Sequence, residues 1–202
     1  MANLDRASGL TPVQYLNGSP WNGKGRMYCI PDTDDTNAYA IGDPVVLAGS
    51  ADANGVATIT LATAGSANSV LGPIISGAGA LKYGEQYGVP ADTPLVIPAT
   101  KTRAYYVMVC DDPNVIFECQ EEDAGTAFAA TDVGFNANLS SGTNNGYISG
   151  WEIDTASPGA GGTLQLKLLG LAQKVNGNAF GDWAKWLVLI NLHCYRIGQV
   201  GY

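Results

Sequence analysis

The sequence predicts an all-β fold, an antiparallel β-sandwich or barrel of about ten short strands with an irregular N-terminal arm. Glycine is frequent, with 26 residues, and 10 prolines accompany it, so long helices would be interrupted. The dipeptide Asn-Gly, which favours the tight turns of β-hairpins, occurs five times. Between these turns lie short apolar runs, or runs in which apolar and polar residues alternate, and both patterns are typical of strands.

Three strands are expected in the first half of the chain. Residues 45–47 follow a Gly-Asp-Pro turn, and residues 56–64 return antiparallel to them past Asn54-Gly55. The second of these runs is rich in β-branched residues, which fit a pleated sheet. Residues 70–79 are expected to form a short buried strand, in which Gly72-Pro73 indicates a bend or an edge position.

The clearest hairpin prediction joins residues 105–110 to residues 115–120 through a typical turn sequence, Asp-Asp-Pro-Asn. In the return strand apolar and polar side chains alternate, which indicates one buried and one wet face. Residues 164–168 and 185–197 alternate in the same way, and the latter run is long enough for one of the longer strands. The helix candidates are weak, and residues 124–134 have room for one turn.

The length of 202 residues fits one ordinary domain, or one domain that carries a long terminal arm. We expect residues 1–28 to form an extended N-terminal arm or a first hairpin, and residues 29–202 to form a single β-rich domain. No apolar stretch approaches the roughly 18 residues that span a membrane. Residues 1–9 lack the apolar core of a secretory signal, so the protein is expected to be made and kept in a cytosol.

The charge balance argues against nucleic acid as a partner. The net charge is -8, and the 10 Lys and Arg residues are scattered from Arg6 to Arg196. Nucleic-acid binding needs clustered positive charge that displaces counterions, and anionic membrane surfaces need the same. We therefore expect neither a nucleic acid nor a membrane as a partner.

No catalytic motif is apparent. The sole histidine, His193, has no nucleophile motif set against it, and we expect it at the surface or in an interface. The four cysteines are widely spaced, which is unlike a zinc site, and we expect reduced core residues. Cys110 and Cys119 flank the predicted hairpin turn and could face one another. The sequence therefore predicts a protein that is not an enzyme.

One acidic stretch partly resembles a calcium-binding loop. Asp32, Asp34, Thr36 and Asp43 stand at loop positions 1, 3, 5 and 12, but the sixth position is Asn37 instead of glycine. Flanking prolines also deny this stretch the two helices of a calcium-binding hand. A solvated turn is the favoured interpretation. The glycine-rich residues 77–84 and 158–163 match no phosphate-binding motif, so no metal or cofactor is expected.

The tryptophans divide into two pairs. Trp151 and Trp186 lie in apolar or alternating runs and are expected in the core. Trp21 and Trp183 stand among glycine and asparagine, so core and interface positions stay open for both.

Several short signatures follow one another along the chain, including G-L-T-P-V at residues 9–13, D-V-G-F-N-A-N-L at residues 132–139 and N-L-H at residues 191–193. Their order resembles that of a family of tailed-bacteriophage structural proteins, the head decoration or cement proteins. The signatures extend from about Gly9 to Tyr195, and their order is more specific than any one of them.

This resemblance implies a non-enzymatic protein that binds the outer surface of the phage head at capsomer junctions and stabilises it. Its partners would be the major capsid protein and itself, often as a homotrimer. It would reside on the capsid exterior of the virion after synthesis in the host bacterial cytoplasm. The alternative is another virion part, such as a head fibre, a tail component or a glycan-binding spike.

The candidate capsid contacts lie in the N-terminal segment. Its apolar side chains would lie on a neighbouring subunit, and its cations would meet carboxylates at the rim of the contact. The apolar set is Leu10, Pro12, Val13, Tyr15 and Trp21, and the cations are Arg6, Lys24 and Arg26. A second interpretation stays open, in which this stretch is simply the first strand and hairpin of the domain.

Overall fold

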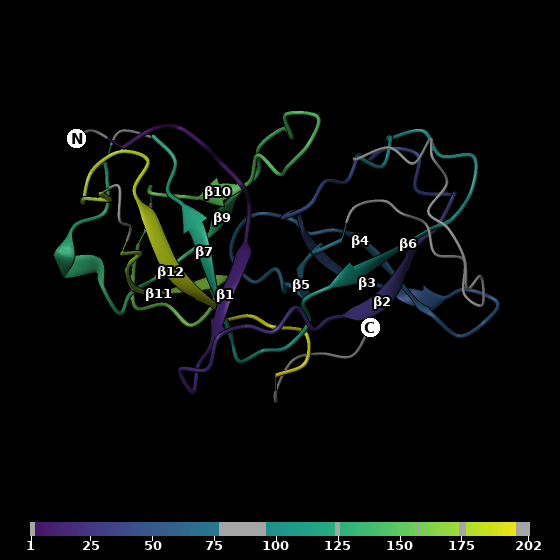
Figure 1. Cartoon of the computed structure of the whole chain (residues 1–202), viewed down its shortest axis with the longest axis horizontal. Coiled ribbons are helices and arrows are strands. Elements are labelled where there is room, and N and C mark those ends of the chain that lie inside the picture. The colour runs from purple at the N-terminus through teal and green to yellow at the C-terminus, as the bar shows by residue number, and fades with distance from the viewer. Residues whose placement is uncertain (1–2, 77–95, 124–125, 157, 174–176, 197–202) are drawn as a thin grey trace.

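The computed structural model describes residues 3–76, 96–123, 126–156, 158–173 and 177–196 (Figure 1). These residues form strands and one 3-10 turn, which confirms the all-β prediction. The strands make two five-stranded sheets and one two-stranded sheet. The two large sheets occupy opposite halves of the molecule in Figure 1. Among the described residues, no helix is long and apolar enough to cross a membrane.

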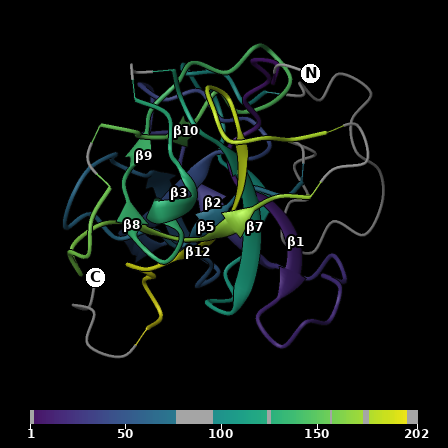
Figure 2. The same cartoon turned by 90° about the vertical axis from the view of Figure 1, so that its left-hand side faces the viewer.

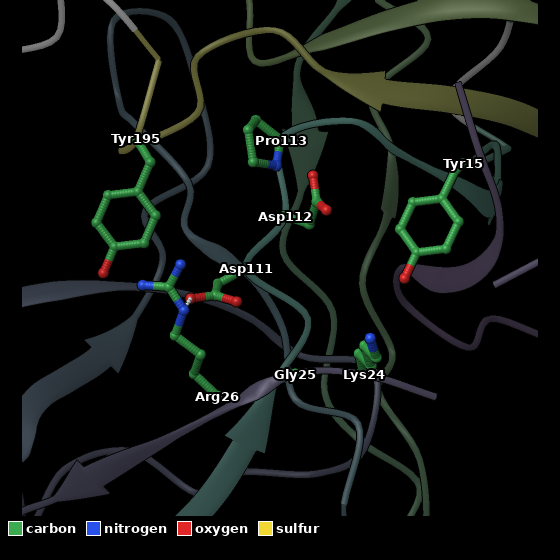
Figure 3. A pocket seen from close by; sticks show the side chains of 8 residues that line it. All are labelled: Tyr15, Lys24, Gly25, Arg26, Asp111, Asp112, Pro113 and Tyr195. Atoms are coloured by element: carbon green, nitrogen blue, oxygen red, sulfur yellow. Dashed lines mark ion pairs between the residues drawn. The ribbon is translucent and has the colours of Figure 1, made fainter. Parts of the chain in front are cut away.

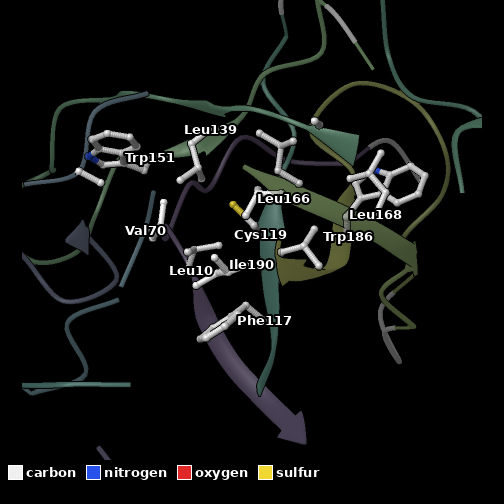
Figure 4. Close-up of a cluster of buried hydrophobic side chains, with 14 of the residues drawn as sticks. Leu10, Val70, Phe117, Cys119, Leu139, Trp151, Leu166, Leu168, Trp186 and Ile190 are labelled. Carbon is white, nitrogen blue, oxygen red and sulfur yellow. The ribbon is translucent and has the colours of Figure 1, made fainter. Parts of the chain in front are cut away.

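The first large sheet is antiparallel throughout and lies in the left half of Figure 1. The two-stranded sheet packs against it, because Leu139 and Ile153 share one buried cluster with Phe117 and Leu166 (Figure 4). We call this half the sandwich. In spatial order its large sheet contains β1 (Thr11–Tyr15), β7 (Val115–Gln120), β12 (Lys185–Ile190), β11 (Leu166–Leu171) and β8 (Asn136–Ala137), and its small sheet contains β9 (Leu139–Ser140) and β10 (Glu152–Ile153).

The second large sheet curls into a small barrel. Its spatial order is β5 (Gly72–Pro73), β3 (Pro44–Ala51), β4 (Ala57–Leu61), β2 (Arg26–Ile30) and β6 (Tyr105–Val109). The β5 segment pairs with β3 on one side, and just beyond it Ile74 pairs with Val109 of β6 on the other. The Ile75 amide also donates to the Met108 carbonyl at 2.9 Å, so the first and last strands meet. Viewed from the sandwich side, the barrel strands lie behind β7 and β12 (Figure 2).

Each half has its own core, and the two cores adjoin. Trp186 and Trp151 are buried in the sandwich core, as the sequence predicts. Ala62, Val70 and Cys110, which come from the barrel side of the chain, belong to the same cluster. The barrel is filled by Tyr28, Ile30, Tyr39, Val45, Ile59, Leu71, Ile74, Ile97, Tyr105, Val107, Val109 and Cys194.

Several local predictions are confirmed. β3 and β4 pair antiparallel around Asn54-Gly55, where Gly55 has the positive φ of 81° that a tight turn requires. The weak helix candidate contains a 3-10 turn at Ala130–Asp132. All four cysteines are buried, and none of them forms a disulfide bond. The predicted strand at 70–79 is present in part as β5 (Gly72–Pro73). The rest of that run from residue 77 and the whole of residues 77–84 lie outside the described residues.

The predicted hairpin between residues 105–110 and 115–120 is wrong. Both runs are strands, but β6 pairs with β2 in the barrel, whereas β7 pairs with β1 and β12 in the sandwich. A turn does form, since the Val115 amide donates to the Asp112 carbonyl at 3.2 Å. Its two arms enter different sheets, so residues 110–114 connect the two halves.

The long strand predicted over residues 185–197 is shorter, because β12 ends at Ile190. The Asn191 amide then donates to the Gln165 carbonyl, and His193 bridges Val70 in parallel. The chain thereby leaves the sandwich and brings Cys194 into the barrel core.

The first 28 residues contribute to both sheets. β1 is the outer strand of the sandwich sheet, and the chain turns back beyond it so that Gln14 pairs with Pro20. The predicted boundary between residues 28 and 29 falls inside β2. Of the two interpretations of this segment, the structure has the first hairpin and not a free arm.

Candidate functional site

Three of the eight candidate contact residues, Tyr15, Lys24 and Arg26, surround one pocket at the junction of the two halves (Figure 3). Its volume is about 470 Å³. We call it the Arg26 pocket. Its lining comes from the end of β1, the start of β2, the connection after β6 and the segment after β12, and consists of Tyr15, Lys24, Gly25, Arg26, Asp111, Asp112, Pro113 and Tyr195.

Arg26 is held in place from two sides. Its Nε atom lies 3.3 Å from Asp111 Oδ2, and its guanidinium carbon lies 5.5 Å from the centre of the Tyr195 ring. The Arg26 side chain is 69% exposed, whereas that of Asp111 is only 7% exposed. The buried carboxylate therefore anchors a guanidinium whose outer part faces the pocket.

Asp111 is itself held by a tyrosine of the barrel core. The Tyr28 hydroxyl donates to Asp111 Oδ2 at 2.6 Å, and the Tyr28 and Tyr195 hydroxyls lie 2.9 Å apart. Burial first, and then the bond to Asp111, raise the pKa of Tyr28 well above its usual value. Tyr28 thus stays protonated and keeps donating to the carboxylate that orients Arg26.

Positive charge gathers at this pocket. Lys24 lines it, and Arg196 Nη2 donates to the Pro113 carbonyl at 3.1 Å. With Arg26, three of the chain's 10 Lys and Arg residues lie here. Asp111 and Asp112 offset two of the charges, so the local balance is positive in a chain whose net charge is -8.

A second hollow, of about 590 Å³, contains Arg6 and is lined by Asp5, Arg6, Ala7, Thr143, Asn145, Ile148, Ser149, Gly150 and Glu152. Burial, with help from the charges of Asp5 and Glu122, raises the pKa of Glu152 to about 7. Arg6 is thus the one candidate cation placed away from the Arg26 pocket.

The remaining candidates lie on or beneath β1. Val13 is 41% exposed, Pro12 is half-buried, and Trp21 is half-buried against the sandwich core. Leu10 has no exposed surface and packs among Phe117, Ile190 and Val70 (Figure 4). Its assignment as a contact is wrong, because the residue before an edge strand points its apolar side chain into the sheet's own core.

His193 is also placed differently from its surface prediction, since it is completely buried. Its Nδ1 accepts a hydrogen bond from the Tyr195 amide at 3.0 Å. Burial, and next the Arg196 charge, lower the pKa of His193 to about 4, so the ring is neutral near neutral pH. The prediction failed because the alternation of β12 does not continue past Ile190.

An ammonium group lies within the loop that partly matches a calcium site. Lys101 Nζ donates to the backbone carbonyls of Asp34, Asn37 and Ala99, the last two at 2.7 and 3.0 Å. The Asp43 carboxylate is directed elsewhere and accepts the Ala40 amide at 2.7 Å. Across the described residues, no group of three or more His, Cys, Asp and Glu side chains is arranged to hold a metal ion. The loop is organised by Lys101, which lies 67 residues after Asp34 in the sequence.

Asp111, Tyr195 and Arg196 were not among the sequence candidates. The Asp-Asp-Pro-Asn run was interpreted as turn chemistry alone, and nothing in the local pattern linked it to the N-terminal segment. The buried Asp111 lies 83 residues from Tyr28, so only the folded chain joins them.

Comparison of the chain with models of protein families, with curated protein sequences and with solved protein structures gives no match.

Proposed function

We propose that this protein is a non-enzymatic decoration protein of a tailed-bacteriophage head. It binds the outer surface of the major capsid protein at capsomer junctions, as a homotrimer, and stabilises the head. The observation that carries the proposal is the convergence of Tyr15, Lys24 and Arg26 on one pocket. The resemblance of the signature order to decoration proteins supports it.

The chemistry of the pocket favours binding over catalysis. The Asp111 carboxylate is engaged by Arg26 and Tyr28, so it is poorly placed to act as a base or a nucleophile. The pocket lies where the two halves meet, and a bound segment would touch both of them. Many such contacts, each weak, stabilise a head through the avidity that icosahedral repetition supplies.

The test uses heads that lack the protein. Purified protein added to such heads should bind at a fixed stoichiometry and raise their resistance to heat, measured by release of packaged DNA. Arg26→Ala should weaken head binding, whereas Lys167→Ala, on β11 of the sandwich, should not. Absence of saturable binding by the unaltered protein would refute the proposal.

A second candidate is a glycan-binding part of the virion. Tyr15 and Tyr195 stand on opposite sides of the pocket with Arg26 and Asp111 between them (Figure 3). Aromatic side chains around polar groups also suit a sugar. Binding to a glycan array without any effect on head stability would favour this candidate.

A further inference from the structure

We infer that the Arg26 pocket is a receptor for a carboxylate on an acidic polypeptide segment of the partner. This inference rests on the proposed function and names the chemistry of the partner's contacting segment. The partner would insert a Glu or Asp side chain toward Arg26, between Tyr15 and Tyr195.

The first argument is the preorganised guanidinium. The ion pair with Asp111 uses Nε, which leaves the two terminal Nη groups of an exposed side chain for a ligand. The ring of Tyr195 restricts the same side chain from another direction. A guanidinium fixed in this way loses little entropy on binding and matches the two oxygens of a carboxylate.

The second argument is the local charge. Lys24 and Arg196 add two positive charges near Arg26, while Asp111 and Asp112 remove two. One net positive charge suits a single carboxylate. A polyphosphate or a nucleic acid would bring several negative charges close to the exposed Asp112, which disfavours those ligands.

The third argument concerns three other described lysines, each of which is buried or has its own partner. Lys101 is buried and donates to backbone carbonyls, Lys185 Nζ lies 3.6 Å from Glu118 Oε1, and Lys167 donates to the Gly134 carbonyl. The net charge of -8 repels an acidic segment from the protein as a whole, whereas the locally positive Arg26 pocket attracts it. The pocket volume of about 470 Å³ lies within the usual range of sites for small ligands.

The experiment uses the isolated full chain, labelled with ¹⁵N, and two peptides that differ only in charge. The acidic probe is acetyl-Tyr-Glu-Glu-Tyr-amide, and the matched neutral probe is acetyl-Tyr-Gln-Gln-Tyr-amide. The acidic peptide should shift amide signals around the pocket and bind roughly tenfold or more tightly than the neutral one. Affinity for the acidic peptide should fall as salt is raised.

Three variants locate the effect. Arg26→Ala should abolish the preference for the acidic peptide. Arg26→Lys should weaken it, because lysine keeps the charge but lacks the planar guanidinium that binds both carboxylate oxygens. Lys167→Ala is the control and should leave the preference unchanged. Each variant should stay folded, because the Arg26 side chain and the Lys167 contact are exposed and Tyr28 still donates to Asp111 when Arg26 is replaced; the amide spectrum checks this.

Equal affinity for the two peptides, or an acidic preference that survives in Arg26→Ala, would overturn the inference. A hexuronic acid oligosaccharide serves as a further probe. If it binds through Arg26 and the acidic peptide does not, the carboxylate comes from a glycan and the polypeptide assignment is wrong. These measurements need no phage heads, so peptide binding by a protein that ignores heads would refute only the proposed function.

Discussion

Glu121 directly follows β7 and should make the stability of this protein fall as the pH rises. Its side chain has no exposed surface. Oε2 accepts hydrogen bonds from Trp186 Nε1 at 2.7 Å and from the Phe128 amide at 3.4 Å, and Oε1 has no hydrogen-bond partner among the described residues. Burial raises the pKa of Glu121 from 4.5 to about 7, against the smaller opposing effect of those hydrogen bonds.

The sign follows from proton binding. Between the unfolded pKa near 4.5 and the folded pKa of about 7, the folded chain holds a proton that the unfolded chain releases. The free energy of unfolding therefore falls as the pH rises through this window. Integrating between about pH 5 and about pH 8 gives a loss of roughly 2.5 kcal/mol from this one carboxyl.

Glu121→Gln tests the magnitude, because the amide keeps an acceptor for Trp186 and cannot ionise. Urea unfolding of both proteins, at constant ionic strength, should show the variant gaining about 2.5 kcal/mol over the unaltered chain between about pH 5 and about pH 8. Glu152 and His193 also titrate, but they contribute equally to both proteins and cancel in the difference. Asp123→Asn, at an exposed neighbouring position, is the control. Parallel stability curves for Glu121→Gln and the unaltered chain would refute the reasoning.

Three further predictions concern stability, each measured by urea unfolding. Gly9→Ala should cost about 3 kcal/mol or more, because φ is +63° and a Cβ would lie 2.1 Å from the Gly42 carbonyl oxygen; Gly18→Ala, also at positive φ but in open space, should cost only about 1 kcal/mol, and equal losses would contradict the clash. Lys101→Met should cost about 2 kcal/mol, since three backbone carbonyls lose an ammonium donor, and an unchanged midpoint would show that water replaces it. His193→Asn should gain stability relative to the unaltered chain as the pH falls from about 6.5 towards 4, because the buried ring resists a proton that the unfolded chain accepts, while Glu121 and Glu152 contribute equally to both proteins; a difference in unfolding free energy that does not change with pH would be evidence against this.

Features decided by neighbouring residues could be predicted from the sequence. Asn54-Gly55 dictates a tight turn whatever surrounds it, so the β3–β4 pair was predictable. The alternation of β7 and β12 likewise identified strands with a buried face, but the wet face predicted for β7 is wrong, because all six of its residues are buried. Strand partners were less predictable, because pairing depends on residues far away in the chain.

The connection between β6 and β7 shows why. Local turn chemistry at residues 111–114 suits a hairpin, but Gly72 packs so closely there that a Cβ would lie 1.9 Å from the Cys110 carbonyl oxygen. Asp111 is also fixed by Arg26 and Tyr28 of β2. These contacts from distant segments hold the end of β6 on the barrel and direct the next strand into the sandwich.

Only the N-terminal part of the candidate site could be predicted from the sequence. Exposed cations and aromatic residues in an irregular stretch pointed to Tyr15, Lys24 and Arg26, and these do converge. Their partners come from residues 111–113 and 195–196, which share no local pattern with them. Leu10 was misassigned because an apolar residue beside an edge strand carries the same local signal whether it faces a partner or its own core.

The position of the N-terminal segment changes which experiment can establish its role. Removing residues 1–20 would take away Leu10 from the sandwich core and β1 from the edge of β7. The shortened chain would then fail to bind heads because it misfolds, whether or not the segment contacts the capsid. A substitution on the exposed side of the segment avoids this ambiguity, because the Arg26 side chain is largely outside the core. The contact hypothesis is therefore decided by Arg26 variants that stay folded and not by deletion.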